Sequence, residues 1–128
     1  MFRIRSAQMD RLGASTRERF VAMMCDYLRK YFPRWVGGLD EPGLTAWVAA
    51  ALDKADRYGV RTEPEAAQLI VLFIVIGLDA DETKPWAEEI LADDSLVALG
   101  KVRALVRLAR EHEIAGVEQA LVFPEMEG

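Results

Sequence analysis

The sequence predicts an all-α fold, a compact bundle of about five to six helices around a central apolar helix. Apolar side chains recur at helical three- and four-residue spacing, proline and glycine stand where such helices would begin and end, and hydrophobic residues make up 52% of the chain. This composition supplies one core. Because no linker or internal repeat interrupts it, we expect residues 1–128 to form a single helical domain.

The first residues predict an extended arm, because Phe2 and Ile4 alternate with arginines over residues 1–5. The spacing then changes, and Met9 and Leu12 recur at helical distance. We expect one short helix there.

A long helix is predicted from Ser15 to about Phe32. Ser15 and Glu18 have the spacing of a capping box, in which each side chain bonds an amide that the first helical turn leaves unpaired. Pro33 ends this helix because it cannot continue the hydrogen-bond ladder. A turn is expected from there to Gly38.

The second long helix shows the most regular pattern in the chain. Pro42 suits its first turn, and Asp40 or Glu41 suits the positive end of the helix. Gly59 is the expected left-handed terminator, and Val60 contacts the last turn behind it. The apolar stripe consists of Leu44, Trp47, Val48, Ala51, Leu52, Ala55 and Tyr58.

A buried central helix is predicted over residues 66–78, which are apolar on nearly every side. Thr62 and Glu65 give a second capping box before it, and Gly77 closes it. Its isoleucines and valines also suit a strand, which stays open as the alternative. The apolar run Leu69–Ile76 is too short to span a bilayer, so no membrane span is predicted.

The remaining chain predicts an acidic loop over residues 79–83, a short helix from Pro85 to Leu91 and one last long helix capped by Asp94 or Ser95. Three arginines off the apolar face of that last helix are expected to point to solvent: Arg103, Arg107 and Arg110. Residues 115–128 lose clear periodicity, and we expect an irregular tail there.

Charge and cysteine content narrow the function classes. The net charge of -5 argues against nucleic acid as a partner, because phosphate binding needs an excess of Lys and Arg. Basic side chains gather in residues 1–34 and acidic ones in residues 35–98, and the two segments either steer a partner or cancel each other. The single cysteine, Cys25, excludes an intrachain disulfide. With no secretory signal, we expect a cytoplasmic location.

No catalytic, cofactor or metal site is predicted. His112, the only imidazole, is expected to meet free carbonyls at a helix end, and Cys25 is expected to be a small buried hydrophobe. One His and one Cys cannot supply a zinc site. The loop from Asp79 lacks the glycine and glutamate of a calcium loop. We therefore expect no cofactor and no enzyme, although a carboxylate pair among the acids of residues 35–98 stays open.

Two tryptophans are candidate contact residues. Trp35 and Trp86 each lie near a helix start, where the ring either covers the core or anchors an interface. Both interpretations stay open, whereas Trp47 lies on the apolar stripe of its helix.

Several short patterns occur together along the chain: Arg3-Ile4-Arg5, Gln8-Met9, Tyr31-Phe32-Pro33, Tyr58-Gly59-Val60, Gly77-Leu78-Asp79, Pro85-Trp86 and Glu89-Ile90-Leu91. The set resembles a family of short, uncharacterised bacterial helical proteins often encoded beside type VI secretion spike and effector genes. The resemblance implies an accessory role, as an adaptor or co-chaperone that holds an effector or spike-tip protein before loading. It supplies no catalytic residues.

Contacts with such a partner are expected at the two tryptophans, at the arm and at an apolar patch in the tail. The arm could pair with a partner strand. Alternatively, both termini pack on their own domain. The expected partner-binding residues are Phe2, Ile4, Trp35, Trp86, Leu121, Val122 and Phe123.

Two other functions are alternatives to the adaptor. An immunity protein would use the acidic segment Asp79–Asp94 against a basic toxin. A small enzyme would need a pocket with converging polar groups. A homodimer is also possible, because the apolar run Leu69–Ile76 needs covering on all sides.

Overall fold

The structure is a computed structural model that describes the backbone of residues 14–120 and the side chains of residues 16–118. All regular elements in this range are helices, so the predicted all-α fold is confirmed. The arm at residues 1–5, the short helix near Met9 and the apolar patch at residues 121–123 lie outside the described residues.

Helix α2 (Ala14–Tyr31) packs an apolar stripe of Phe20, Met24 and Leu28 into the core. The helix already includes Ser15, so the predicted cap at Ser15 is wrong, because an N-cap residue needs a non-helical backbone. Pro33 ends α2 as predicted.

The segment after α2 is not the irregular turn that the sequence predicts. Pro33–Val36 forms the helical turn α3, with Pro33 at its first position, where the missing amide hydrogen loses no bond. The Val36 amide donates to the Phe32 carbonyl at 3.2 Å, and the Val36 side chain is only 1% exposed. Burial of Val36 therefore holds this turn in helical form.

Helix α4 (Glu41–Arg57) begins and ends as predicted. The Asp40 carboxylate accepts a hydrogen bond from the Gly43 amide at 2.8 Å and caps the helix. Gly59 has a φ of 83°, and the Val60 amide donates to the Ala55 carbonyl at 2.8 Å. This is the Schellman arrangement, which needs a left-handed residue at position 59.

Helix α5 (Glu63–Ile76) is the buried central helix, and the strand alternative is wrong. Its residues Leu69 to Phe73 are all 0% exposed. Thr62 is its N-cap residue, but the Thr62 hydroxyl makes no capping bond, so the predicted capping box is wrong. The hydroxyl oxygen is buried and has no hydrogen-bond partner within the described residues.

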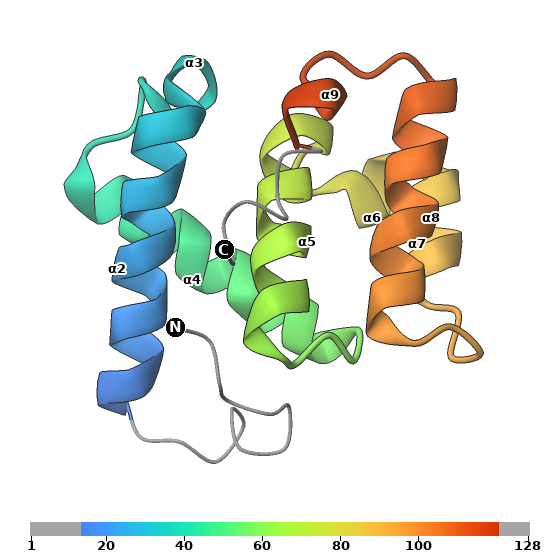
Figure 1. Cartoon of the computed structure of the whole chain (residues 1–128), viewed down its shortest axis with the longest axis horizontal. Coiled ribbons are helices and arrows are strands. Elements are labelled where there is room, and N and C mark those ends of the chain that lie inside the picture. The colour runs from blue at the N-terminus through green and yellow to red at the C-terminus, as the bar shows by residue number, and fades with distance from the viewer. Residues whose placement is uncertain (1–13, 121–128) are drawn as a thin grey trace.

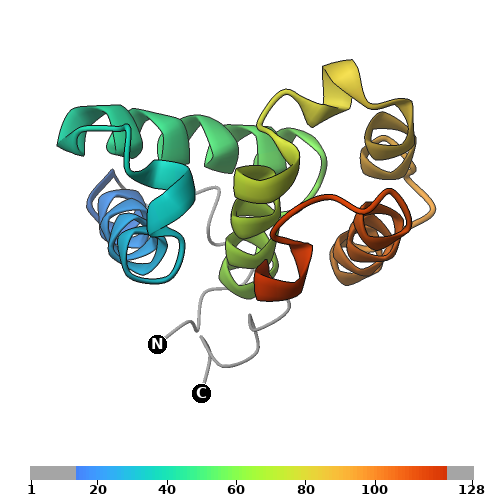
Figure 2. The same cartoon turned by 90° about the horizontal axis from the view of Figure 1, so that it is seen from above.

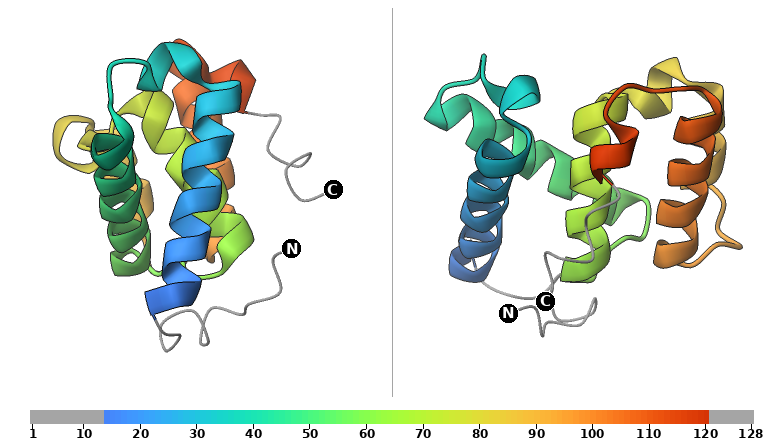
Figure 3. Two further views of the ribbon diagram at one scale, coloured as in Figure 1. Left: turned by 90° about the vertical axis from the view of Figure 1, so that its left-hand side faces the viewer. Right: turned by 45° about the horizontal axis from the view of Figure 1, so that its top comes forward.

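The helices lie in two layers around α5 (Figures 1 and 2). Helices α2 and α8 (Ala98–Glu111) flank α5 on opposite sides, and α4 crosses behind them with α6 (Ala80–Thr83) and α7 (Pro85–Leu91). Figure 3 shows α4 beside α2 and the short α9 (Val117–Ala120) against α5. The apolar run that suggested a dimer is thus covered within one chain, since α5 contacts α2, α4, α8 and α9.

Three segments in the second half differ from expectation. The acidic loop at residues 79–83 contains the helical turn α6, and residues 117–120 of the expected irregular tail form α9, whose Val117 is 5% exposed. The N-cap of α8 is Val97, so neither Asp94 nor Ser95 caps that helix. Ser95 instead donates its amide and its hydroxyl to the Asp93 carboxylate, at 2.9 and 2.6 Å. The three arginines of α8 are exposed as predicted.

Trp35 and Trp86 both contact the segment that joins α8 to α9. Trp86 stacks on His112 with 4.9 Å between ring centroids and 10° between ring planes. Trp35 packs so closely on Gly116 that a Cβ built there would lie 2.4 Å from the Trp35 ring. These two contacts fasten the segment to α7 and α3.

Substitution Gly116→Ala should lower the free energy of unfolding by about 2 to 4 kcal/mol, from overpacking against Trp35 and a left-handed backbone at φ 92°. Gly59→Ala is the matched control, because position 59 is also left-handed but has open space around its Cβ. It should lower stability by only about 1 kcal/mol. Urea unfolding measures both values, and equal losses would contradict the Trp35 contact.

Candidate functional site

Two lysines are buried where the end of α4 meets the helices that follow it. Lys54 on α4 is 8% exposed and Lys101 on α8 is 4% exposed. Both lie on the apolar faces of their helices, Lys54 four residues before Tyr58 and Lys101 four residues before Leu105. A lysine on an apolar helix face is the sequence signal that indicates a buried cation, and the sequence analysis did not recognise it at either position.

Lys54 forms a buried ion pair with Asp81 of α6. Its ammonium donates to the Asp81 carboxylate at 2.7 Å and to the Leu78 carbonyl at 2.8 Å. The Tyr58 hydroxyl donates to the other carboxylate oxygen of Asp81 at 2.8 Å. The expectation that residues 79–83 are a solvated acidic connector is thus wrong for Asp81, whose side chain is 7% exposed.

Two pKa values at the ion pair shift in opposite directions. Burial by itself would raise the pKa of Asp81, but hydrogen bonds from Lys54 and Tyr58 outweigh it and hold this pKa below its usual value. Burial, followed by the hydrogen bond to Asp81, raises the pKa of Tyr58 to about 12. The carboxylate is therefore stabilised as an anion and the phenol as a neutral donor.

Lys101 bonds to backbone carbonyls in place of a carboxylate. Its ammonium donates to the carbonyls of Tyr58 and Leu91, each at 2.7 Å. These carbonyls belong to the ends of α4 and α7, where helix carbonyls lack partners within the helix. In the part of the chain that the structure describes, Lys101 forms no ion pair.

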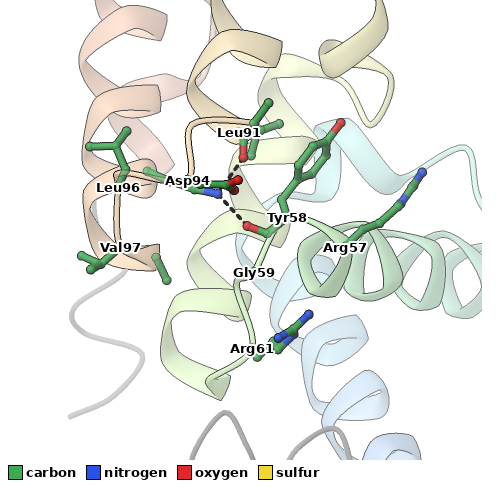
Figure 4. A pocket seen from close by; sticks show the side chains of 11 residues that line it. Arg57, Tyr58, Gly59, Arg61, Leu91, Asp94, Leu96 and Val97 are labelled. Atoms are coloured by element: carbon green, nitrogen blue, oxygen red, sulfur yellow. Dashed lines mark hydrogen bonds between the residues drawn. The ribbon is translucent and has the colours of Figure 1, made fainter.

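A pocket of about 330 Å³ opens beside Lys101. Figure 4 shows Leu96 and Val97 on one side of it and Arg57 and Arg61 on the other, with the two bonded carbonyls between them. It is lined also by Tyr58, Gly59, Leu91, Ala92, Asp94 and Ala98. The pocket combines a buried cation with the amino end of α8.

A second, more apolar depression of about 370 Å³ lies between α2 and α4. Arg17 stands at its edge and pairs with Asp53 at 2.6 Å. The other lining residues are Glu18, Val21, Ala22, Thr45 and Ala49. We call this depression the α2–α4 groove.

The thiol and the imidazole are far apart in the fold. Cys25 lies on α2 and His112 at the end of α8, on opposite sides of α5 (Figure 1). Cys25 is 5% exposed, and burial raises the pKa of its thiol. His112 stacks on Trp86, a contact that the sequence did not indicate. Between residues 14 and 120, no group of three His, Cys, Asp or Glu side chains could hold a metal ion.

The expected partner-binding residues fall into two groups. Trp35 and Trp86 are half-buried and pack against the core on different helices, α3 and α7. The other five, Phe2, Ile4 and residues 121–123, lie outside the described residues.

Comparison of the chain with models of protein families, with curated proteins and with solved structures found no match. Within residues 14–120, no helix has the combined length and apolarity needed to cross a membrane.

Substitution Asp81→Asn should lower the free energy of unfolding by about 3 kcal/mol at neutral pH, because it leaves the buried Lys54 ammonium without its counter-charge. The folded-state pKa of Asp81 lies below the unfolded value near 3.8, so the stabilisation is complete above that pH and is lost as the pH falls through the folded-state pKa. The difference between wild type and Asp81→Asn should therefore shrink below about pH 4.

Urea unfolding of both proteins between pH 7 and pH 3 measures this difference. Tyr58→Phe is the control, because it removes one hydrogen bond to Asp81 and keeps the ion pair. It should lower stability by about 1 kcal/mol. An Asp81→Asn deficit that stays constant over the whole pH range would contradict the stabilising ion pair.

Proposed function

We propose that this chain is a non-catalytic accessory protein that binds another protein, as an adaptor or co-chaperone for a type VI secretion effector or spike-tip protein. The α2–α4 groove is the observation that carries the proposal. Its floor combines Val21 with the small side chains of Ala22 and Ala49, which permit close approach of a partner backbone.

The rim of the groove specifies the chemistry of its occupant. Arg17 and Glu18 offer charges of both signs at one end of the apolar floor. Such a surface suits an amphipathic helix of the partner, with apolar side chains toward Val21 and Ala49 and charged side chains at the rim. Both walls are long helices, so the groove is preformed.

The two buried lysines and the residues around them have structural partners. Lys54, Asp81 and Tyr58 bond to one another, and Lys101 bonds to two helix ends. These bonds hold α4, α6, α7 and α8 together, which supports a rigid binding scaffold.

Substitution Ala22→Arg should weaken binding of an effector or spike-tip partner at least about tenfold, because a long charged side chain fills the groove. Ala22 is exposed on α2, and arginine is a good helix former, so the fold should survive. Ala46→Arg is the matched control, since Ala46 is exposed on α4 outside the groove.

The measurement is pairwise co-purification and titration of each variant against effectors and spike-tip proteins of the same bacterium. Equal affinity of the Ala22→Arg and Ala46→Arg proteins would exclude the groove as the docking surface. If no such protein binds the folded wild type, the adaptor function is wrong.

An exposed acidic surface favours immunity as a second candidate function. The acidic side chains of α6, α7 and the loop after them are mostly exposed, and Lys84 is the only basic residue among them. A basic toxin would be attracted to this surface. The exposed acids are Asp79, Glu82, Glu88, Glu89 and Asp94.

Protection against a toxin tests this second function. Co-expression with the toxic domain should restore growth, and the double substitution Glu88→Lys and Glu89→Lys should abolish the rescue by reversing charge at the centre of the surface. Growth curves measure the effect, with Ala22→Arg as the control that keeps protection. Undiminished rescue by the double variant would contradict recognition through α7.

A further inference from the structure

We propose that the pocket beside Lys101 binds a small organic oxyanion, a carboxylate or a phosphate monoester, between the Lys101 ammonium and the amino end of α8. This site is separate from the α2–α4 groove, and the inference does not depend on the proposed function.

The amino end of α8 lies beside the pocket, which Val97 and Ala98 line, and no side chain caps its first amides. Val97 is the N-cap residue, and its side chain cannot accept a hydrogen bond. The first backbone bond of the helix runs from the Lys101 amide to the Val97 carbonyl at 3.0 Å, which leaves the amides of residues 98–100 without a helical partner. Such amides and the helix dipole attract an anion.

Lys101 provides a second and independent feature. Its side chain lines the pocket although the residue is 4% exposed, and an ammonium carries three N–H donors. Two of these donors bond to the carbonyls of Tyr58 and Leu91. One donor therefore remains, on a cation that forms no ion pair within the described residues.

The ionisable residues of the pocket favour an anion as well. Its lining contains three basic side chains, Arg57, Arg61 and Lys101, and one acidic side chain, Asp94. Arg61 also bonds to Asp56 at 2.8 Å, and Lys101 helps to lower the pKa of Asp93. Both carboxylates lie outside the lining, and the lining itself has more basic than acidic side chains. This excess stands out in a chain whose net charge is -5.

The size and the apolar part of the lining indicate a small organic ligand. A volume of about 330 Å³ lies at the lower end of the range for small-molecule sites. Leu91, Leu96 and Val97 provide apolar surface next to the cationic end. We therefore expect a short carbon chain against the leucines and the oxyanion at Lys101 and residues 98–100.

Titration with inorganic phosphate and, separately, with butyrate at constant ionic strength tests the site by amide NMR. Either probe should shift the amide signals of residues 98–100, and a response to one probe alone identifies the class of oxyanion. No shift with either probe at millimolar concentration would overturn the proposal.

Two substitutions at Val97 test the charge requirement while preserving the fold. Val97 is 74% exposed, and aspartate is a preferred N-cap residue, so Val97→Asp should stabilise α8 while its carboxylate repels the ligand and occupies the amides. We expect at least a tenfold loss of affinity for Val97→Asp and only about a twofold loss for the neutral control Val97→Ala, which removes part of the apolar lining and adds no charge. Unchanged binding by Val97→Asp would overturn the proposal.

Lys101→Met tests the ammonium directly. The probe that binds should raise the melting temperature of the wild type and leave that of a folded Lys101→Met protein unchanged. An equal rise in both proteins would exclude Lys101 from the site. If this variant does not fold, the comparison of Val97→Asp with Val97→Ala still tests the proposed site.

Discussion

The packing of the second half of the molecule depends on the need of two buried ammonium groups for acceptors. The Lys54 ammonium donates to the Asp81 carboxylate, which also accepts from the Tyr58 hydroxyl. The Lys101 ammonium donates to the Tyr58 backbone carbonyl. A buried cation without acceptors is strongly unfavourable. The end of α4 therefore fixes where α6, α7 and α8 can lie, and Gly59 turns the chain away at the same point.

Local features of the fold could be predicted from the sequence because they depend on neighbours in the chain. Gly59, the Asp40 cap and the apolar stripe of α4 follow from spacing alone. The capping box at Thr62 failed in the folded chain. The Thr62 hydroxyl has the right neighbour at Glu65, but in the folded chain this hydroxyl is buried and makes no capping bond.

The candidate site could not be predicted because its partners are distant in sequence. Lys54 bonds to Asp81, and Lys101 to Tyr58, and no local pattern joins either pair. Trp35 and Trp86 were recognised as notable rings, but their contacts with Gly116 and His112 arise only in the folded chain. A lysine on an apolar stripe was the one sign of the site that local spacing contained.

The contact of Trp35 with Gly116 also forms late during synthesis of the chain. A nascent chain can form α2 to α7 from local contacts, yet Trp35 and Val75 meet Gly116 only after most of the chain has left the ribosome. Until then the tryptophan face of α3 and the adjoining end of α5 lack this cover. The growing chain thus exposes apolar side chains of α3 and α5, and the arrival of the last described turn covers them.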